Sequence, residues 1–64
     1  MTKKEIQADM LSEYIFNMDL WWMLKQSGSD VAAKRYHADA AVYADMLEKY
    51  FNVDAFQIWL DRSE

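Results

Sequence analysis

The chain of 64 residues is long enough for one domain, spanning residues 1–64, and leaves no room for a second. It has no cysteine, which excludes disulfide bonds and thiolate metal sites, and its formal net charge of −4 argues against binding nucleic acid or anionic membranes through clustered bases. Because no apolar run approaches the length of a membrane span and the polar N-terminus lacks the apolar segment of a signal peptide, we expect a cytoplasmic protein.

The first predicted helix runs from about Lys3 to Gln26. Thr2 and Glu5 have the spacing of a capping box, in which the threonine hydroxyl accepts a hydrogen bond from the amide three residues later. Gly28 suits the left-handed position that follows the end of a helix. At helical spacing, one broad apolar face contains Ile6, Met10, Leu11, Tyr14, Ile15, Met18, Trp21 and Trp22.

Ser29 or Asp30 caps a second predicted helix, which runs to about Phe51. The early half of its apolar face is mostly alanine, which lets another helix approach closely, and the late half is bulky. This face contains Ala32, Ala33, Tyr36, Ala40, Tyr43, Ala44, Met46, Leu47, Tyr50 and Phe51.

Asp54 and Gln57 have the spacing of another capping box and predict a short third helix over about Ala55 to Arg62. One side of it would carry three large apolar side chains: Phe56, Trp59 and Leu60. No segment shows the pattern of a strand. The predicted fold is therefore all-α, a small three-helix domain with two long antiparallel helices plus a short C-terminal helix.

The first helix has a second apolar stripe on a different face, formed by Phe16, Leu20, Met23 and Leu24. Toward the N-terminus the same spiral row is acidic and contains Glu5, Asp9 and Glu13. In one interpretation the third helix covers the stripe, so that Phe56, Trp59 and Leu60 contact Phe16, Leu20 and Leu24. In the other, the short third helix cannot cover it, and the stripe stays open for docking.

The adjacent Trp21 and Trp22 point about 100° apart around the helix axis, so we expect them to occupy different pockets. In one interpretation one tryptophan belongs to the core and the other anchors a partner or a second copy; in the other, both are buried within the chain. The predicted partner-binding residues are therefore Asp9, Glu13, Phe16, Leu20, Trp22, Met23 and Leu24.

The side chains needed for catalysis are scarce. His37 is the only histidine, which excludes a metal site with two histidines in one chain, and the sequence has no glycine-rich phosphate loop. The acidic row has a rise of about 6 Å between successive members and lacks carbonyl ligands, so it is interpreted as a solvated face. We expect no enzyme activity, no cofactor and no small-molecule substrate.

A helix-turn-helix drawn across residues 52–54 would place only one basic residue, Arg62, on its recognition helix, so nucleic-acid binding is disfavoured. The sequence instead predicts a small non-catalytic protein-binding module: an adaptor, regulator or inhibitor. By analogy, such small acidic helical proteins are often carried by phages or mobile elements. The alternatives are a homo-oligomeric structural helical protein, paired through the stripe or the alanine-rich face, and a small helix-turn-helix nucleic-acid binder.

Overall fold

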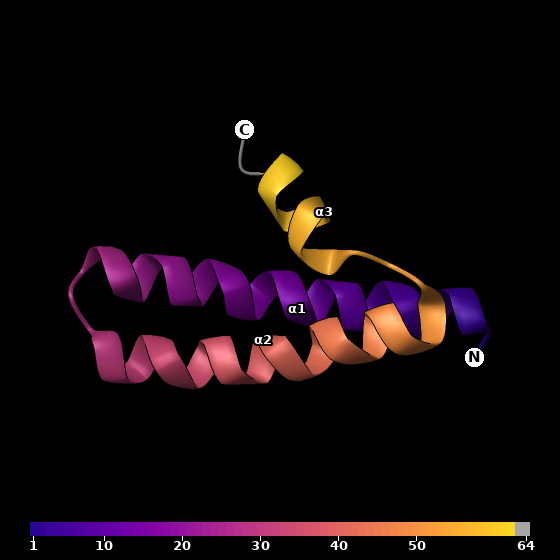
Figure 1. The fold of residues 1–64 in the computed structure, drawn as a ribbon, viewed down its shortest axis with the longest axis horizontal. Coiled ribbons are helices and arrows are strands. Elements are labelled where there is room, and N and C mark those ends of the chain that lie inside the picture. The colour runs from indigo at the N-terminus through magenta and orange to yellow at the C-terminus, as the bar shows by residue number, and fades with distance from the viewer. Residues whose placement is uncertain (63–64) are drawn as a thin grey trace.

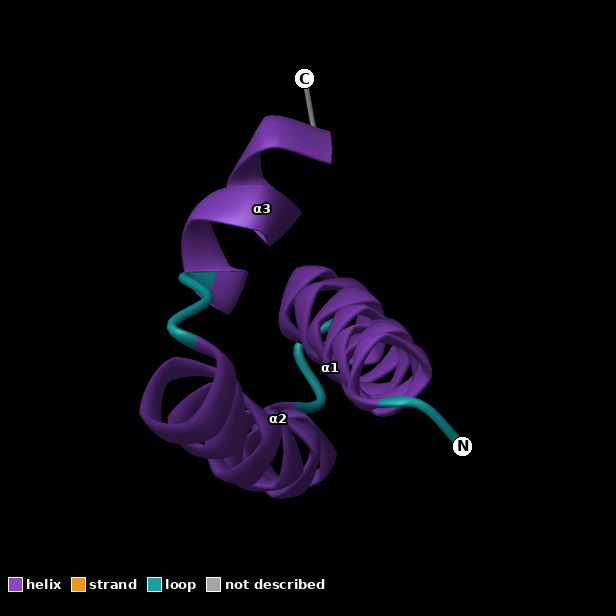
Figure 2. Ribbon diagram, turned by 90° about the vertical axis from the view of Figure 1, so that its right-hand side faces the viewer, coloured by secondary structure: helices purple, strands orange, loops and turns teal. Residues whose placement is uncertain are grey.

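The computed structural model describes residues 1–62 and contains three α-helices: α1 (Lys3–Gln26), α2 (Asp30–Phe51) and α3 (Ala55–Arg62). Helices α1 and α2 form an antiparallel hairpin, and α3 begins over the middle of the hairpin and then runs away from it (Figure 1, Figure 2). The described residues contain no strand, so the predicted all-α fold and the bounds of its three helices are confirmed. None of these helices is both long enough and apolar enough to cross a membrane.

Hydrogen bonds between residues close in sequence determine where α1 and α3 begin. The Thr2 hydroxyl oxygen accepts from the Glu5 amide at 3.2 Å and donates to the Glu5 carboxylate at 3.1 Å, which confirms the first capping interaction. At the start of α3, the Asp54 carboxylate accepts from the Gln57 amide at 3.2 Å. The Gln57 side chain does not reach back as the capping box predicts, because it donates to Asp61 at 3.0 Å.

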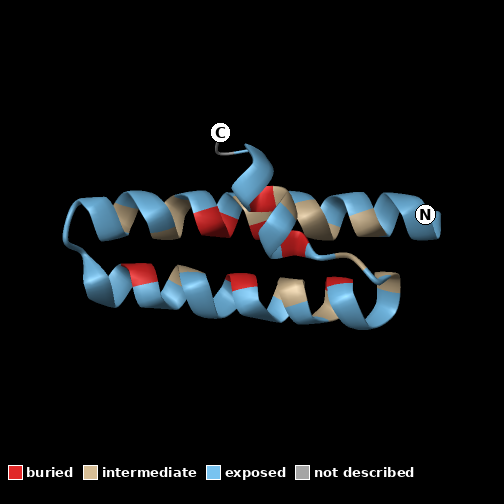
Figure 3. Cartoon of the chain, turned by 45° about the horizontal axis from the view of Figure 1, so that its top comes forward, coloured by how far each residue is buried: buried red, intermediate tan, exposed pale blue. Residues whose placement is uncertain are grey.

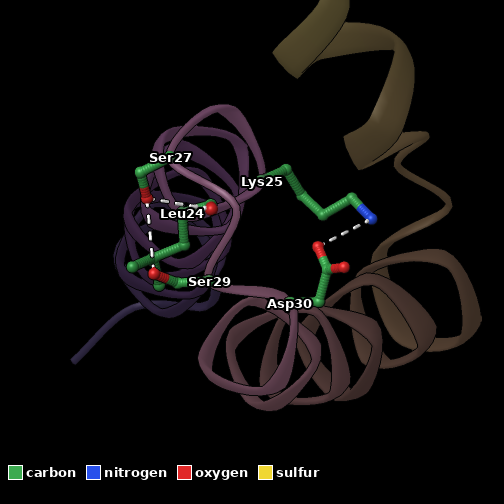
Figure 4. Close-up of polar contacts among 5 residues, drawn as sticks. All are labelled: Leu24, Lys25, Ser27, Ser29 and Asp30. Atoms are coloured by element: carbon green, nitrogen blue, oxygen red, sulfur yellow. Dashed lines mark hydrogen bonds and ion pairs between the residues drawn. The ribbon is translucent and has the colours of Figure 1, made fainter.

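The turn between α1 and α2 is closed by backbone hydrogen bonds around Gly28. The Ser27 hydroxyl adds side-chain hydrogen bonds to the Leu24 carbonyl at 3.1 Å and to the Ser29 hydroxyl at 3.4 Å (Figure 4). Gly28 has a φ of 83°, and its amide donates to the Lys25 carbonyl while the Ser29 amide donates to the Leu24 carbonyl. The Lys25 ammonium also lies 3.5 Å from the Asp30 carboxylate across the turn. The predicted left-handed glycine is therefore the residue that allows the hairpin to reverse direction.

We expect Gly28→Ala to lower the free energy of unfolding by about 1 kcal/mol, measured by urea denaturation. A Cβ on Gly28 meets nothing within 4 Å, so the whole effect comes from the positive φ. Asn52 has the same left-handed conformation, with a φ of 55°, and is the matched control. Asn52→Gly is expected to change the free energy of unfolding by less than about 0.5 kcal/mol, because two effects oppose each other. Glycine adopts a positive φ without strain, but it also makes the unfolded chain more flexible. Equal effects of the two substitutions would contradict this account.

Two residues from each helix form the buried centre of the protein (Figure 3): Tyr14 and Met18, Ala40 and Leu47, and Ala55 and Trp59. On α2 the buried positions recur every seven residues, at Ala33, Ala40 and Leu47. Two of these three are alanine, and both come from the early, alanine-rich half of the predicted apolar face.

The ends of the predicted apolar faces are less covered than expected. Ile6 is 40% exposed and Tyr50 61% exposed, because α3 lies over the middle of the hairpin and does not reach these positions. Asn17 is buried instead, although the sequence analysis did not place it in the core. Its side-chain amide donates to the Glu13 carbonyl at 2.8 Å, which satisfies a polar group between apolar neighbours.

Burial, together with the negative charge of Asp54, raises the pKa of the Tyr14 hydroxyl. The folded protein therefore keeps this proton at a pH where the unfolded chain, with a tyrosine pKa near 10, has lost it. Because the unfolded state then binds fewer protons than the folded state, the free energy of unfolding is expected to fall as the pH rises above about 10. Urea denaturation between about pH 8 and about pH 11 measures this loss.

The Tyr14→Phe variant removes the titrating hydroxyl and should show a smaller alkaline loss of stability than the wild type. Tyr50→Phe is the matched control, since Tyr50 is 61% exposed and lies outside the buried centre. An alkaline loss that is the same in the wild type and in both variants would show that Tyr14 does not contribute to it.

Candidate functional site

The first candidate surface is the α1 stripe, defined as Phe16, Leu20, Met23 and Leu24. Phe16 is 60% exposed and Met23 is 64% exposed, whereas Leu20 and Leu24 are partly buried. Phe16 lies about 160° around the helix axis from the buried Met18, so it projects away from the centre of the protein. The stripe therefore presents large apolar side chains to solvent along a regular helix.

The second part of this surface is the acidic row, defined as Glu5, Asp9 and Glu13. All three side chains are exposed. Among residues 1–62 the ion pairs are Lys25 with Asp30 and Arg62 with Asp19, so no lysine or arginine neutralises the row. The structure thus places Asp9 and Glu13 on the helix face that continues into the stripe, as the sequence predicts.

Trp22, the remaining predicted partner-binding residue, lies on a different surface from the stripe, as its place on the broad apolar face of the first helix predicts. It lies about 120° around the helix axis from Phe16 and is 52% exposed. It borders an apolar groove of about 420 Å³ between α1 and α3, which we call the aromatic groove and which is lined by Trp21, Trp22, Phe56, Trp59 and Leu60. The predicted binding residues therefore fall on two separate surfaces.

Trp21 and Trp22 line the same groove, which contradicts the expectation of different pockets. Their ring centroids are 6.1 Å apart. The rotation of about 100° around the α1 axis separates the two Cα positions, but the side chains are long enough for both rings to reach the groove beside α3. Trp21 is partly buried and packs against the core, and its ring also lies 5.3 Å from the exposed His37 ring.

Helix α3 contacts α1 through the buried Trp59 and through Arg62. The Trp59 indole N–H donates to the Asp19 carboxylate at 2.9 Å, and the Trp59 ring meets the Trp21 ring edge-on at a centroid distance of 6.1 Å. The Arg62 guanidinium lies 4.0 Å from the other Asp19 oxygen. Helix α3 therefore lies against the side of α1 that carries Asp19 and Trp22, and the α1 stripe keeps its exposed phenylalanine and methionine.

The role of Asp19 as the acceptor for Trp59 was not predicted from the sequence. Trp59 was expected on the apolar side of the third helix, and a buried indole N–H requires a hydrogen-bond acceptor. The sequence therefore indicated that some acceptor faces Trp59, but not that it is Asp19. One of the two interpretations of the stripe placed Phe56 and Leu60 over it, but these residues line the aromatic groove and are 51% and 38% exposed.

Among residues 1–62 no group of three histidine, cysteine, aspartate or glutamate side chains is placed to hold a metal ion. Comparisons of the chain with protein-family models, with curated proteins and with solved structures found no match. Function is therefore inferred from the exposed surface of α1.

Proposed function

We propose that this protein is a small non-catalytic protein-binding module, an adaptor, regulator or inhibitor, that docks through the α1 stripe and the acidic row. The observation that supports it is the exposure of Phe16 and Met23, at 60% and 64%, on a helix whose other side forms the core. Contiguous exposed apolar side chains beside charged ones are typical of interaction surfaces. Because the stripe belongs to a long regular helix, docking requires little ordering of the backbone, which favours affinity.

Site-specific crosslinking tests this proposal. A photoreactive amino acid at Phe16 or at Met23 should form an adduct of defined mass with another protein in extract of the cells that make the chain. The matched control is the same amino acid at Val42, which is 58% exposed on α2. Adducts formed equally at all three positions, or no adducts at Phe16 and Met23, would contradict the proposal.

The double variant Phe16→Asp/Met23→Asp separates docking from folding. Because both side chains are exposed, each substitution should change the free energy of unfolding by less than about 0.5 kcal/mol. The variant should nevertheless prevent adduct formation from a photoreactive group at the neighbouring Leu20. Adducts that join two copies of this chain, accompanied by a dimer mass in light scattering, would favour the homo-oligomeric structural protein instead.

A further inference from the structure

We infer that the partner contributes a basic amphipathic helix that lies along α1, with apolar side chains on the α1 stripe and lysine or arginine on the acidic row. This inference rests on the proposed function, because it names the kind of partner that the same surface accepts. It depends on three properties of the surface: its length and shape, its carboxylates without ion-pair partners, and the absence of lysine and arginine from the same α1 face of a second copy.

The shape of the surface favours a helix as the occupant. The acidic row and the stripe follow one face of α1 from Glu5 to Leu24, a length of about 29 Å. An extended peptide on this convex face would leave its backbone N–H and C=O groups unpaired, since those of α1 are bonded within the helix. A helix satisfies its own backbone and packs its side-chain ridges between those of α1 over the whole length.

The charge of the surface favours a basic occupant. Three carboxylates, those of Glu5, Asp9 and Glu13, are exposed along the row. Of the three lysines of α1, Lys3 has its ammonium 5.7 Å from the centre of the Phe51 ring and Lys25 pairs with Asp30. The third, Lys4, lies about 100° around the helix axis from Glu5 and forms no ion pair with the row. Apolar side chains docked on the stripe would bring the partner close to these carboxylates, where cations are favoured and anions are repelled.

The same charges disfavour the α1 helix of a second copy as the occupant. Two α1 helices that pair in parallel would place one acidic row beside the other. Two that pair antiparallel would place each row against the apolar stripe, which has no lysine or arginine. With a net charge of −4 for each chain, neither arrangement supplies the missing cations.

Three designed peptides test the inference. Each is a helix of about 20 residues with the same apolar half, and the other half carries lysine, glutamine or glutamate at the three positions that face the row. Each is made with the charged half at either end, since helices pack parallel or antiparallel. Fluorescence anisotropy of labelled peptides should give about tenfold tighter binding for lysine than for glutamine, and the difference should shrink as salt is added.

A charge-reversed protein provides the matched comparison. In Glu5→Lys/Asp9→Lys/Glu13→Lys the order of the peptides should reverse, so that the glutamate peptide binds most tightly. The control Asp39→Lys/Asp45→Lys/Glu48→Lys makes the same change in net charge on exposed positions of α2 and should keep the original order. A reversal in the control as well would show that net charge alone, and not the row, decides affinity, and would overturn the inference.

The outcomes separate this inference from the proposed function. If the three peptides bind equally, the basic character of the partner is wrong, and docking through the stripe stands. If no peptide binds while Phe16 and Met23 still form adducts with another protein, the partner is not a basic helix and the inference fails alone. If no peptide binds and no adduct forms, the proposed function fails as well.

Discussion

Replacing Trp59 by alanine is expected to release α3 from the hairpin and to cost about 3 kcal/mol of stability. The Trp59 side chain is only 7% exposed, its indole N–H donates to Asp19, and its ring packs on Trp21 and Phe56. An isolated helix of eight residues is unstable in water, so α3 should lose its helical structure once it is released. Amide hydrogen exchange should then show the loss of protection in α3 while α1 and α2 remain protected.

Two further variants separate the contributions of the Trp59 side chain. Trp59→Phe keeps an aromatic ring but loses the hydrogen bond to Asp19, and should cost about 1 kcal/mol. Leu60→Ala, at the neighbouring position and 38% exposed, should cost less than Trp59→Ala and leave α3 protected. Wild-type protection of α3 in Trp59→Ala would show that Trp59 does not hold the helix in place.

Replacing Leu47 by alanine is expected to destabilise the whole hairpin by about 3 kcal/mol. Leu47 is fully buried and belongs to the core that α1, α2 and α3 share, so its removal leaves a cavity between the helices. In a domain of this size such a loss lowers the melting temperature by more than about 10 °C, which thermal unfolding followed by far-ultraviolet circular dichroism measures. Protection from amide exchange should fall in all three helices together.

Val42→Ala is the matched control for Leu47→Ala on the same helix. Val42 is 58% exposed, so its truncation should change the free energy of unfolding by less than about 0.5 kcal/mol. A similar drop in melting temperature for the two variants would mean that burial at Leu47 does not determine the stability of the hairpin.

The bounds of the helices were predictable because local chemistry determines them. Thr2 and Asp54 cap their helices through amides three residues away, and Gly28 adopts the left-handed conformation in the turn itself. The position of α3 was not predictable in the same way. It depends on a hydrogen bond between Trp59 and Asp19, which are forty residues apart in the sequence, and helical spacing does not indicate such a contact.

The part of the candidate site that lies on a single helix was also predictable from local sequence. Helical spacing placed Phe16 and Met23 on one face with the acidic row, because these residues belong to a single helix. Trp22 was predicted to bind a partner from the other apolar face, and nothing in α1 indicates that α3 passes beside it and forms the aromatic groove. The role of these residues in docking stays a prediction.

The aromatic groove also determines what spectroscopy of this protein reports. All three tryptophans of the chain lie there, with Trp21 at 6.1 Å from both Trp22 and Trp59. Fluorescence excited selectively at tryptophan therefore senses the junction of α1 and α3, whereas far-ultraviolet circular dichroism senses every helix. Coincident melting curves from these probes would mean that α3 and the hairpin unfold as one cooperative unit, and an earlier fluorescence transition would reveal a folded hairpin without its third helix.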